Sequence, residues 1–220
     1  MNSTLRRLLV LPFLALASCA GQETTRTGFL SSYDKLQPTK EHSSDLIYVS
    51  PDYVPAHYTK VVIEDVAWRP AEGAPQRNAD VAMELQDEFR KSLSKALAKN
   101  FTIVSAQDER GSGVLRVRGA ITSTRRANWY VNAPAMLVGL PPVNPGGASV
   151  EIEVLDPGRS EVVVALATYN NGMPWNIIGN FQQFGHARRA FNLASELLLE
   201  LLTPKSVKSV ASTKAQALQE

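Results

Sequence analysis

The side chains that most often do chemistry in proteins are few in this chain and widely scattered. His42, His57 and His186 include no pair at a helical spacing that would hold zinc. The sequence has no Gly-x-Ser-x-Gly motif, and Gly111-Ser112-Gly113 is too short for a phosphate-binding loop. We therefore predict no catalytic residue, no metal site and no cofactor, and a protein that is not an enzyme.

Glu151 and Glu153 are the carboxylates whose spacing suggests acid–base work, because residues two apart lie on one face of a strand. The alternative is a charge match across the sheet. If Arg118 faces Glu151 and Arg116 faces Glu153, the apolar faces of the same two strands match as well. This register favours an antiparallel pair with its charges on the solvent face over a catalytic pair. The two alternating patterns span Gly113–Thr122 and Ala148–Leu155.

Cys19 is the one cysteine of the chain, and it follows a pattern typical of exported proteins. Arg6 and Arg7 supply positive charge, and small residues directly precede Cys19. The apolar run between them, Leu8–Ala17, is about ten residues long and too short to span a bilayer, which takes roughly 20 residues. A single thiol in an exported protein needs an explanation. Lipid attachment supplies one, and a chance cysteine after an ordinary signal peptide is the alternative.

Leu16-Ala17-Ser18-Cys19 is similar to the lipobox cut by lipoprotein signal peptidase. The resemblance implies that residues 1–18 are a signal peptide and that Cys19 is the lipidation site, carrying diacylglycerol and palmitate-like acyl chains. Several chains on one residue give a stable membrane anchor. In Gram-negative lipoproteins, an aspartate after the cysteine retains the protein at the inner membrane. Ala20 at that position therefore implies the outer membrane, with the domain facing the periplasm.

The remaining chain is predicted to form a tether, one domain and a tail. The signal carries two of the 23 basic residues and none of the 21 acidic ones, so 21 of each remain. Such a balance, without a basic stripe, predicts no nucleic-acid partner. Residues 19–44 are polar and form the lipid-anchored tether; 45–204 form the domain; 205–220 form a disordered tail. Four residues of the tether recur at helical spacing and either dock on the domain or are stray apolar residues: Phe29, Leu30, Tyr33 and Leu36.

Hydrophobic periodicity predicts runs of strands with two helices. Asn78 or Asp80 is the expected cap of the first helix, and Pro204 ends the second. This order predicts an α+β fold, with a mostly antiparallel sheet of about five to six strands and both helices packed on one face. The expected strands are 46–49, 58–68, 101–105, 113–122, 148–155 and 161–169, and the expected helices are 81–97 and 184–202.

Several of these stretches together resemble a family of bacterial lipoproteins called domain of unknown function 3313. They are Thr27-Gly28-Phe29-Leu30 with Tyr33 and Leu36, the helix Val81–Leu97, the strand Val114–Thr122, and Gly147–Glu153. The family has no assigned activity, so the resemblance implies no catalytic residue. The layout is also reminiscent of small periplasmic α+β domains, which is a likeness of fold and not of function.

Two long stretches, Ala127–Gly146 and Asn170–Gly185, are rich in Gly, Pro and Asn yet strongly apolar. Alternating strand direction puts both at the same end of the sheet, provided that the connections are hairpin-like. We expect one cluster there that is at least partly exposed and binds a partner. The alternative is a buried lid. The expected partner-binding residues are Trp129, Tyr130, Leu137, Trp175 and Ile178.

The sequence thus predicts a non-enzymatic outer-membrane lipoprotein whose periplasmic domain binds or scaffolds a protein of the cell envelope. The lipid anchor makes the membrane its other partner, and an oligomer is compatible with the sequence. The first alternative is a lipid-anchored module that binds a small molecule or a cell-wall glycan beneath the two loops. A hydrolase is the third interpretation.

Overall fold

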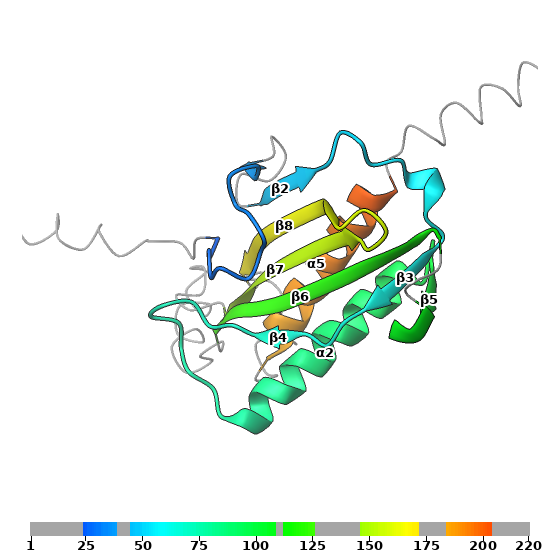
Figure 1. Cartoon of the computed structure of the whole chain (residues 1–220). Coiled ribbons are helices and arrows are strands. Elements are labelled where there is room, and N and C mark those ends of the chain that lie inside the picture. The colour runs from blue at the N-terminus through cyan, green and yellow to red at the C-terminus, as the bar shows by residue number, and fades with distance from the viewer. Residues whose placement is uncertain (1–23, 39–44, 109–111, 126–145, 172–183, 204–220) are drawn as a thin grey trace, which may run out of the picture.

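The computed structural model describes residues 24–38, 45–108, 112–125, 146–171 and 184–203 (Figure 1). The predicted signal peptide, Cys19 and the predicted tail lie outside these ranges. Within them, no helix is long and apolar enough to cross a membrane. The strands are β1 (Gln37–Pro38), β2 (Leu46–Val49), β3 (Lys60–Ile63), β4 (Ala67–Trp68), β5 (Thr102–Val104), β6 (Val114–Arg125), β7 (Gly147–Asp156) and β8 (Glu161–Asn171). The helices are α2 (Ala79–Leu97) and α5 (Gly185–Leu202), with short 3₁₀ turns η2 (Pro55–His57) and η3 (Ala106–Asp108).

The strands form one mixed sheet in the order β1-β2-β8-β7-β6-β3-β5, with β4 paired to β6. In this spatial order, the neighbouring pairs β1–β2, β2–β8, β8–β7 and β7–β6 are antiparallel. The pairs β6–β3 and β3–β5 are parallel, and so is β4–β6. The prediction of an α+β fold is confirmed, but a mostly antiparallel sheet of five to six strands is wrong. The reason is α2, which carries the chain from β3 back to its neighbour β5, and such a crossover makes two strands parallel.

The helices and their caps agree with the sequence pattern. Asn78 caps α2 by accepting a hydrogen bond from the backbone N–H of Val81 at 3.1 Å. The predicted strand 58–68, by contrast, is divided between β3 and β4. Both short strands pair in parallel with the much longer β6, Lys60–Ile63 with Val114–Val117 and Ala67–Trp68 with Ala120–Ile121.

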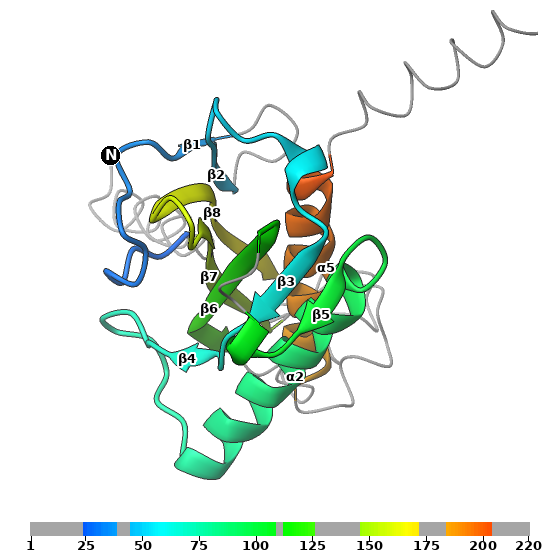
Figure 2. The same cartoon turned by 45° about the vertical axis from the view of Figure 1, so that its right-hand side comes forward.

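Both helices pack on one face of the sheet, as Figure 2 shows. Phe89 of α2 and Phe191 of α5 stack at the centre, with ring centroids 4.9 Å apart, and both side chains are fully buried. Gly119 of β6 makes room for this pair, because a Cβ there would lie 3.3 Å from Cε1 of Phe89.

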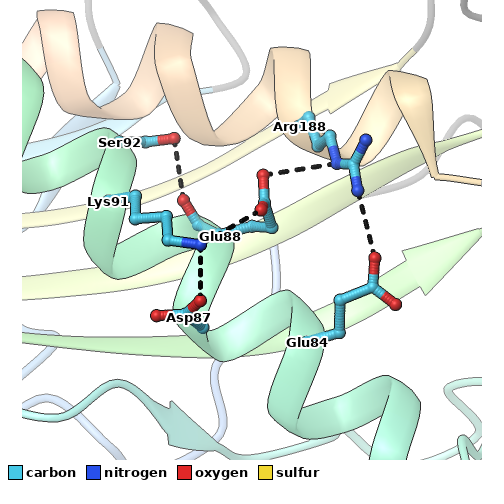
Figure 3. Close-up of polar contacts among 6 residues, drawn as sticks. All are labelled: Glu84, Asp87, Glu88, Lys91, Ser92 and Arg188. Carbon is cyan, nitrogen blue, oxygen red and sulfur yellow. Dashed lines mark hydrogen bonds and ion pairs between the residues drawn. The ribbon is translucent and has the colours of Figure 1, made fainter.

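A polar network joins the two helices outside this core (Figure 3). Arg188 of α5 pairs with Glu84 at 3.0 Å and with Glu88 at 3.3 Å, both on α2. Lys91 pairs with Asp87 at 2.7 Å and lies 3.6 Å from Glu88. Arg188 therefore ties α5 to α2 on the exposed side of the helix pair.

The two ends of the sheet differ, and the pairing of β6, β7 and β8 defines them. At the loop end, Gly147 pairs with both Arg125 and Asn171. At the turn end, Asp156 pairs with Glu161 across a tight turn, next to Val114. Gly147 has φ 147°, and a Cβ there would lie 2.4 Å from the carbonyl oxygen of Asn170, so the loop end requires glycine at this position.

The antiparallel pairing of β6 with β7 is confirmed, but the predicted register is wrong by two residues. Arg118 pairs with Glu153 and not with Glu151, while Arg116 pairs with Leu155. Ala120 stands opposite Glu151. A shift of two keeps each side chain on its predicted face, so the apolar match between the strands survives the error.

Candidate functional site

The candidate site lies on the face of the sheet opposite the helices. Strand alternation sends Glu151 and Glu153 to this face, away from the core beneath α2 and α5. Both carboxylates are nevertheless fully buried. What covers them is a stretch near the N-terminus, residues 24–36, which we call the docked segment. Figure 2 shows it on the other side of the sheet from α5.

Glu151 binds the first part of the docked segment. Its Oε1 accepts the backbone N–H of Thr27 at 2.9 Å, and its Oε2 accepts the hydroxyls of Thr27 at 3.0 Å and Tyr33 at 2.6 Å. The phenolic oxygen of Tyr33 in turn accepts the backbone N–H of Gly28 at 2.9 Å. Burial, and then the hydrogen bond to Glu151, raise the pKa of Tyr33, so its hydroxyl stays a donor.

Glu153 binds the middle of the docked segment in the same manner. Its Oε1 accepts the backbone N–H of Ser31 at 2.8 Å, and its Oε2 accepts the Ser31 hydroxyl at 3.0 Å. Arg118 lies 3.6 Å from Glu153 and donates to the carbonyl oxygen of Phe29 at 3.1 Å. The guanidinium also lies over the Phe29 ring, 4.9 Å from its centroid. Arg118 therefore joins β7 to the docked segment.

Apolar contacts complete the docking. Leu30 and Leu36 are buried against Ala165 and Ala167 of β8, with Phe29 and Tyr33 packed alongside. The two alanines leave space for the larger side chains of the docked segment. This decides between the alternatives that the sequence left open: the apolar residues of 24–36 dock on the domain, without forming a helix. The expected tether of residues 19–44 thus includes a stretch that belongs to the packed domain.

The arrangement fixes what the two carboxylates can do. All four of their oxygens accept hydrogen bonds from the chain itself, and Glu153 also lines a small cavity beside the docked segment. Charge-assisted bonds of this kind are roughly twice as strong as neutral ones. The predicted solvent-exposed charge match is corrected here: Glu153 does pair with Arg118, but under a cover, and Glu151 binds the docked segment. The pair acts as a clamp on the polypeptide.

A cavity of about 260 Å³ lies beside the clamp, nearer the turn end of the sheet. Lys35, Tyr48, Asp52 and Glu161 are among its lining side chains. Ligand pockets are commonly about 300–1,000 Å³, so this one is small. The binding pocket expected beneath the two loops would lie at the opposite end. In the described ranges, no group of acidic, histidine or cysteine side chains could hold a metal ion.

The predicted partner-binding residues, Trp129, Tyr130, Leu137, Trp175 and Ile178, lie outside the described residues, as does Cys19. The strands that flank the two loops are described. Arg125, where the first loop begins, and Asn171, where the second begins, both pair with Gly147. Both loops therefore leave from the same end of the sheet, as the alternation of strand direction predicts.

Sequence reasoning missed the clamp because it assigned Glu151 and Glu153 to solvent. One signal was available: β8 carries Ala165 and Ala167 on the same face, where a solvated strand usually carries longer polar side chains. Small residues on an outward face indicate that something packs there. The polar donors Thr27, Ser31 and Tyr33 give no such signal by themselves.

Comparison with known proteins places the whole arrangement within one family. The family model described as "Protein of unknown function (DUF3313)" matches residues 25–198, a range that includes the docked segment and both glutamates. No curated protein matches the chain.

Among solved structures, a PelC dodecamer from Paraburkholderia phytofirmans is similar, at 12% identity and TM-score 0.44 over 69% of this chain and 96% of that chain. The hypothetical protein CT253 from Chlamydia trachomatis is similar at 15% identity and TM-score 0.38, over 66% of this chain and 98% of that one.

Proposed function

The chain belongs to the family described as "Protein of unknown function (DUF3313)", and we propose that it is a non-enzymatic lipoprotein of the bacterial outer membrane. In this proposal Cys19 carries the lipid, and the periplasmic domain binds a protein partner of the cell envelope. The family description assigns no activity, so the proposal rests on this chain's own residues.

One observation carries the proposal: the docked segment begins almost directly after the lipobox. Thr25, six residues beyond Cys19, already donates a hydrogen bond to Thr122 at 2.5 Å. Thr27, Ser31 and Tyr33 then hold Glu151 and Glu153. In an anchored domain any pull from the membrane acts first on these residues, and the clamp fixes them to the core. The clamp supports such a role.

The proposed contact surface comprises Trp129, Tyr130, Leu137, Trp175 and Ile178. Its support is topological, because the two loops that carry these residues leave from the same end of the sheet. Aromatic side chains are enriched where proteins bind each other, and Trp and Tyr dominate their binding energy.

The anchoring is tested by replacing Cys19→Ser and labelling cells with radioactive palmitate. We expect the variant to lose the label and to accumulate as unprocessed precursor. Ser32→Ala, outside the lipobox and exposed, is the matched control and should keep the label. Equal labelling of Cys19→Ser and the control would refute lipid attachment at this residue.

The partner surface is tested by in-cell crosslinking followed by identification of the captured protein. We expect the double variant Trp129→Ser/Trp175→Ser to lose the crosslink while its melting temperature stays unchanged. A large fall in melting temperature would instead show that the two loops form a structural lid over the core, contrary to the proposal.

A further inference from the structure

The docked segment enters the domain at a defined place. Thr25 lies at Thr122, three residues from the loop end of β6. From there the segment runs toward the turn end, since Ser31 reaches Glu153 and Lys35 lies over the ring of Tyr48, 5.2 Å from its centroid. The end of the docked segment that is nearer to Cys19 in the sequence therefore lies toward the loop end.

Chain length then limits how the domain can sit on a membrane that holds Cys19. Thr25 lies six positions after Cys19, and a fully extended chain of that length spans at most roughly 22 Å. From Thr122 to Val114, at the turn end, eight residues of β6 cover roughly 26 Å. With its turn end against the bilayer, the domain would hold Thr25 at or beyond the full extension of the tether. Chain length therefore favours an orientation with the loop end toward the bilayer.

Charge distinguishes the loop end further. Among the described residues there, Arg26, Arg69 and Arg125 are exposed, and Arg77 lies beside Thr124, to which it donates hydrogen bonds. Glu84 at this end is paired with Arg188. The other described carboxylates there are Glu72 and Asp80, so the four arginines outnumber them. At the turn end, by contrast, both signs of charge occur together: Asp52 and Glu161 line one cavity with Lys35, and Asp156 is paired with Arg159.

We propose that the loop end of the domain lies against the bilayer and contacts anionic phospholipid through these arginines. The inference rests on the proposed lipidation of Cys19 and deepens the proposed function, because a partner bound at this end must be accessible at the membrane surface. Attraction between arginines and anionic headgroups acts within a Debye length of the surface, about 8 Å at physiological salt. The short tether allows the arginines to come within that range.

The test uses the lipidated full-length protein, purified from membranes and reconstituted in vesicles of phosphatidylcholine with a minor fraction of phosphatidylglycerol and an acceptor-labelled lipid. Because the chain has one cysteine and the lipid occupies it, an introduced cysteine takes the donor dye specifically. Gln76→Cys reports on the loop end and Ala56→Cys, in η2, on the turn end; both positions are exposed.

We expect energy transfer from Gln76→Cys to exceed that from Ala56→Cys by about twofold or more, since the ends of β6 are roughly 36 Å apart. Equal or reversed transfer in vesicle-bound, lipidated protein would overturn the proposed orientation. Failure of the proposed lipid anchoring looks different: mass spectrometry would find no lipid on Cys19.

A second comparison isolates the charge. Arg69→Gln/Arg125→Gln, made in the Gln76→Cys background, should lose transfer, and omitting phosphatidylglycerol should reduce transfer in the unsubstituted protein as well. Lys60→Gln/Lys95→Gln removes the same charge toward the turn end and should change nothing. If both double variants behave alike, or if neutral vesicles give the same transfer, the proposed arginine contact with anionic lipid is wrong.

Discussion

The hydroxyl of Tyr33 donates a hydrogen bond of 2.6 Å to Oε2 of Glu151, 118 residues further along the chain. The same phenolic oxygen accepts the backbone N–H of Gly28 at 2.9 Å. Tyr33 thus closes the docked segment on itself while fixing it to β7. Glu151 is fully buried in consequence, so the segment is an integral part of the fold and should respond to single-atom changes.

Tyr33→Phe removes this hydroxyl and keeps the ring. We expect the free energy of unfolding to fall by about 1–2 kcal/mol, because Oε2 of Glu151 loses a donor in a buried site. Hydrogen exchange should quicken in residues 24–36. Tyr48→Phe is the matched control, since its ring packs in the same cluster, and should stay within about 0.5 kcal/mol. Equal effects of the two variants in urea unfolding would contradict the role of the Tyr33 hydroxyl.

Arg118 and Arg116 should differ in their contribution to stability, although both alternate onto the same face. Arg118 faces a buried Glu153, so Arg118→Ala leaves that carboxylate with fewer partners and should cost about 2–3 kcal/mol. Arg116 pairs with Glu64 at 3.5 Å where both side chains are partly exposed, so Arg116→Ala should cost about 0–1 kcal/mol. Chemical denaturation measures both costs, and similar values would show that Glu153 is not clamped.

Phe89→Ala tests the contact between the two helices. Phe89 is fully buried and stacked on Phe191, so the cavity left behind should cost about 3–5 kcal/mol. Met83→Ala, on an exposed position of the same helix, should change stability by less than about 0.5 kcal/mol. Thermal and urea unfolding give the comparison. A small effect of Phe89→Ala would mean that the helix pair is not centred on this stack.

His186, near the start of α5, should make stability depend on pH. Burial, and then the nearby charge of Arg189, lower the pKa of His186 in the folded state. In the unfolded chain the imidazole binds a proton below about pH 6.5. Between those two pKa values only the unfolded state gains the proton, so the free energy of unfolding falls as pH drops below about 6.5 and is unaffected above it.

The measurement is the urea midpoint at about pH 7.5 and about pH 5.5, on either side of that unfolded-state pKa. His186→Gln should show a smaller fall between the two conditions than the wild type. His57→Gln, at an exposed position, serves as the control and should behave like the wild type. An identical fall in all three proteins would rule out a contribution from His186.

The local sequence pattern predicted helices and strands correctly where burial in the core or exposure to solvent was the only influence on their faces. The stripe of α2 and the alternation of β6 and β7 gave elements, faces and pairing partners, because a helix period of 3.6 and a strand period of 2 are properties of neighbouring residues. The same alternation placed both loops at one end of the sheet. The family resemblance is confirmed as well.

The register of β6 on β7 shows where pattern stopped being informative. Matching Arg118 to Glu151 assumed that both side chains face water, where opposite charges seek each other. In the folded protein Glu151 lies opposite Ala120 and meets the docked segment, so its partners come from a different part of the chain. A charge pattern on two strands cannot reveal that the docked segment covers them.

By itself, then, the sequence determined an α+β domain with two amphipathic helices and a long antiparallel hairpin region, since local periodicity encodes each of these. Only the tertiary structure decided that β3 runs parallel to both β5 and β6, because the place of β3 between these two strands is set by how distant segments pack. It alone decided that Glu151 and Glu153 hold residues 24–36. Contacts between residues more than a hundred positions apart depend on which surfaces meet, and no local pattern specifies that.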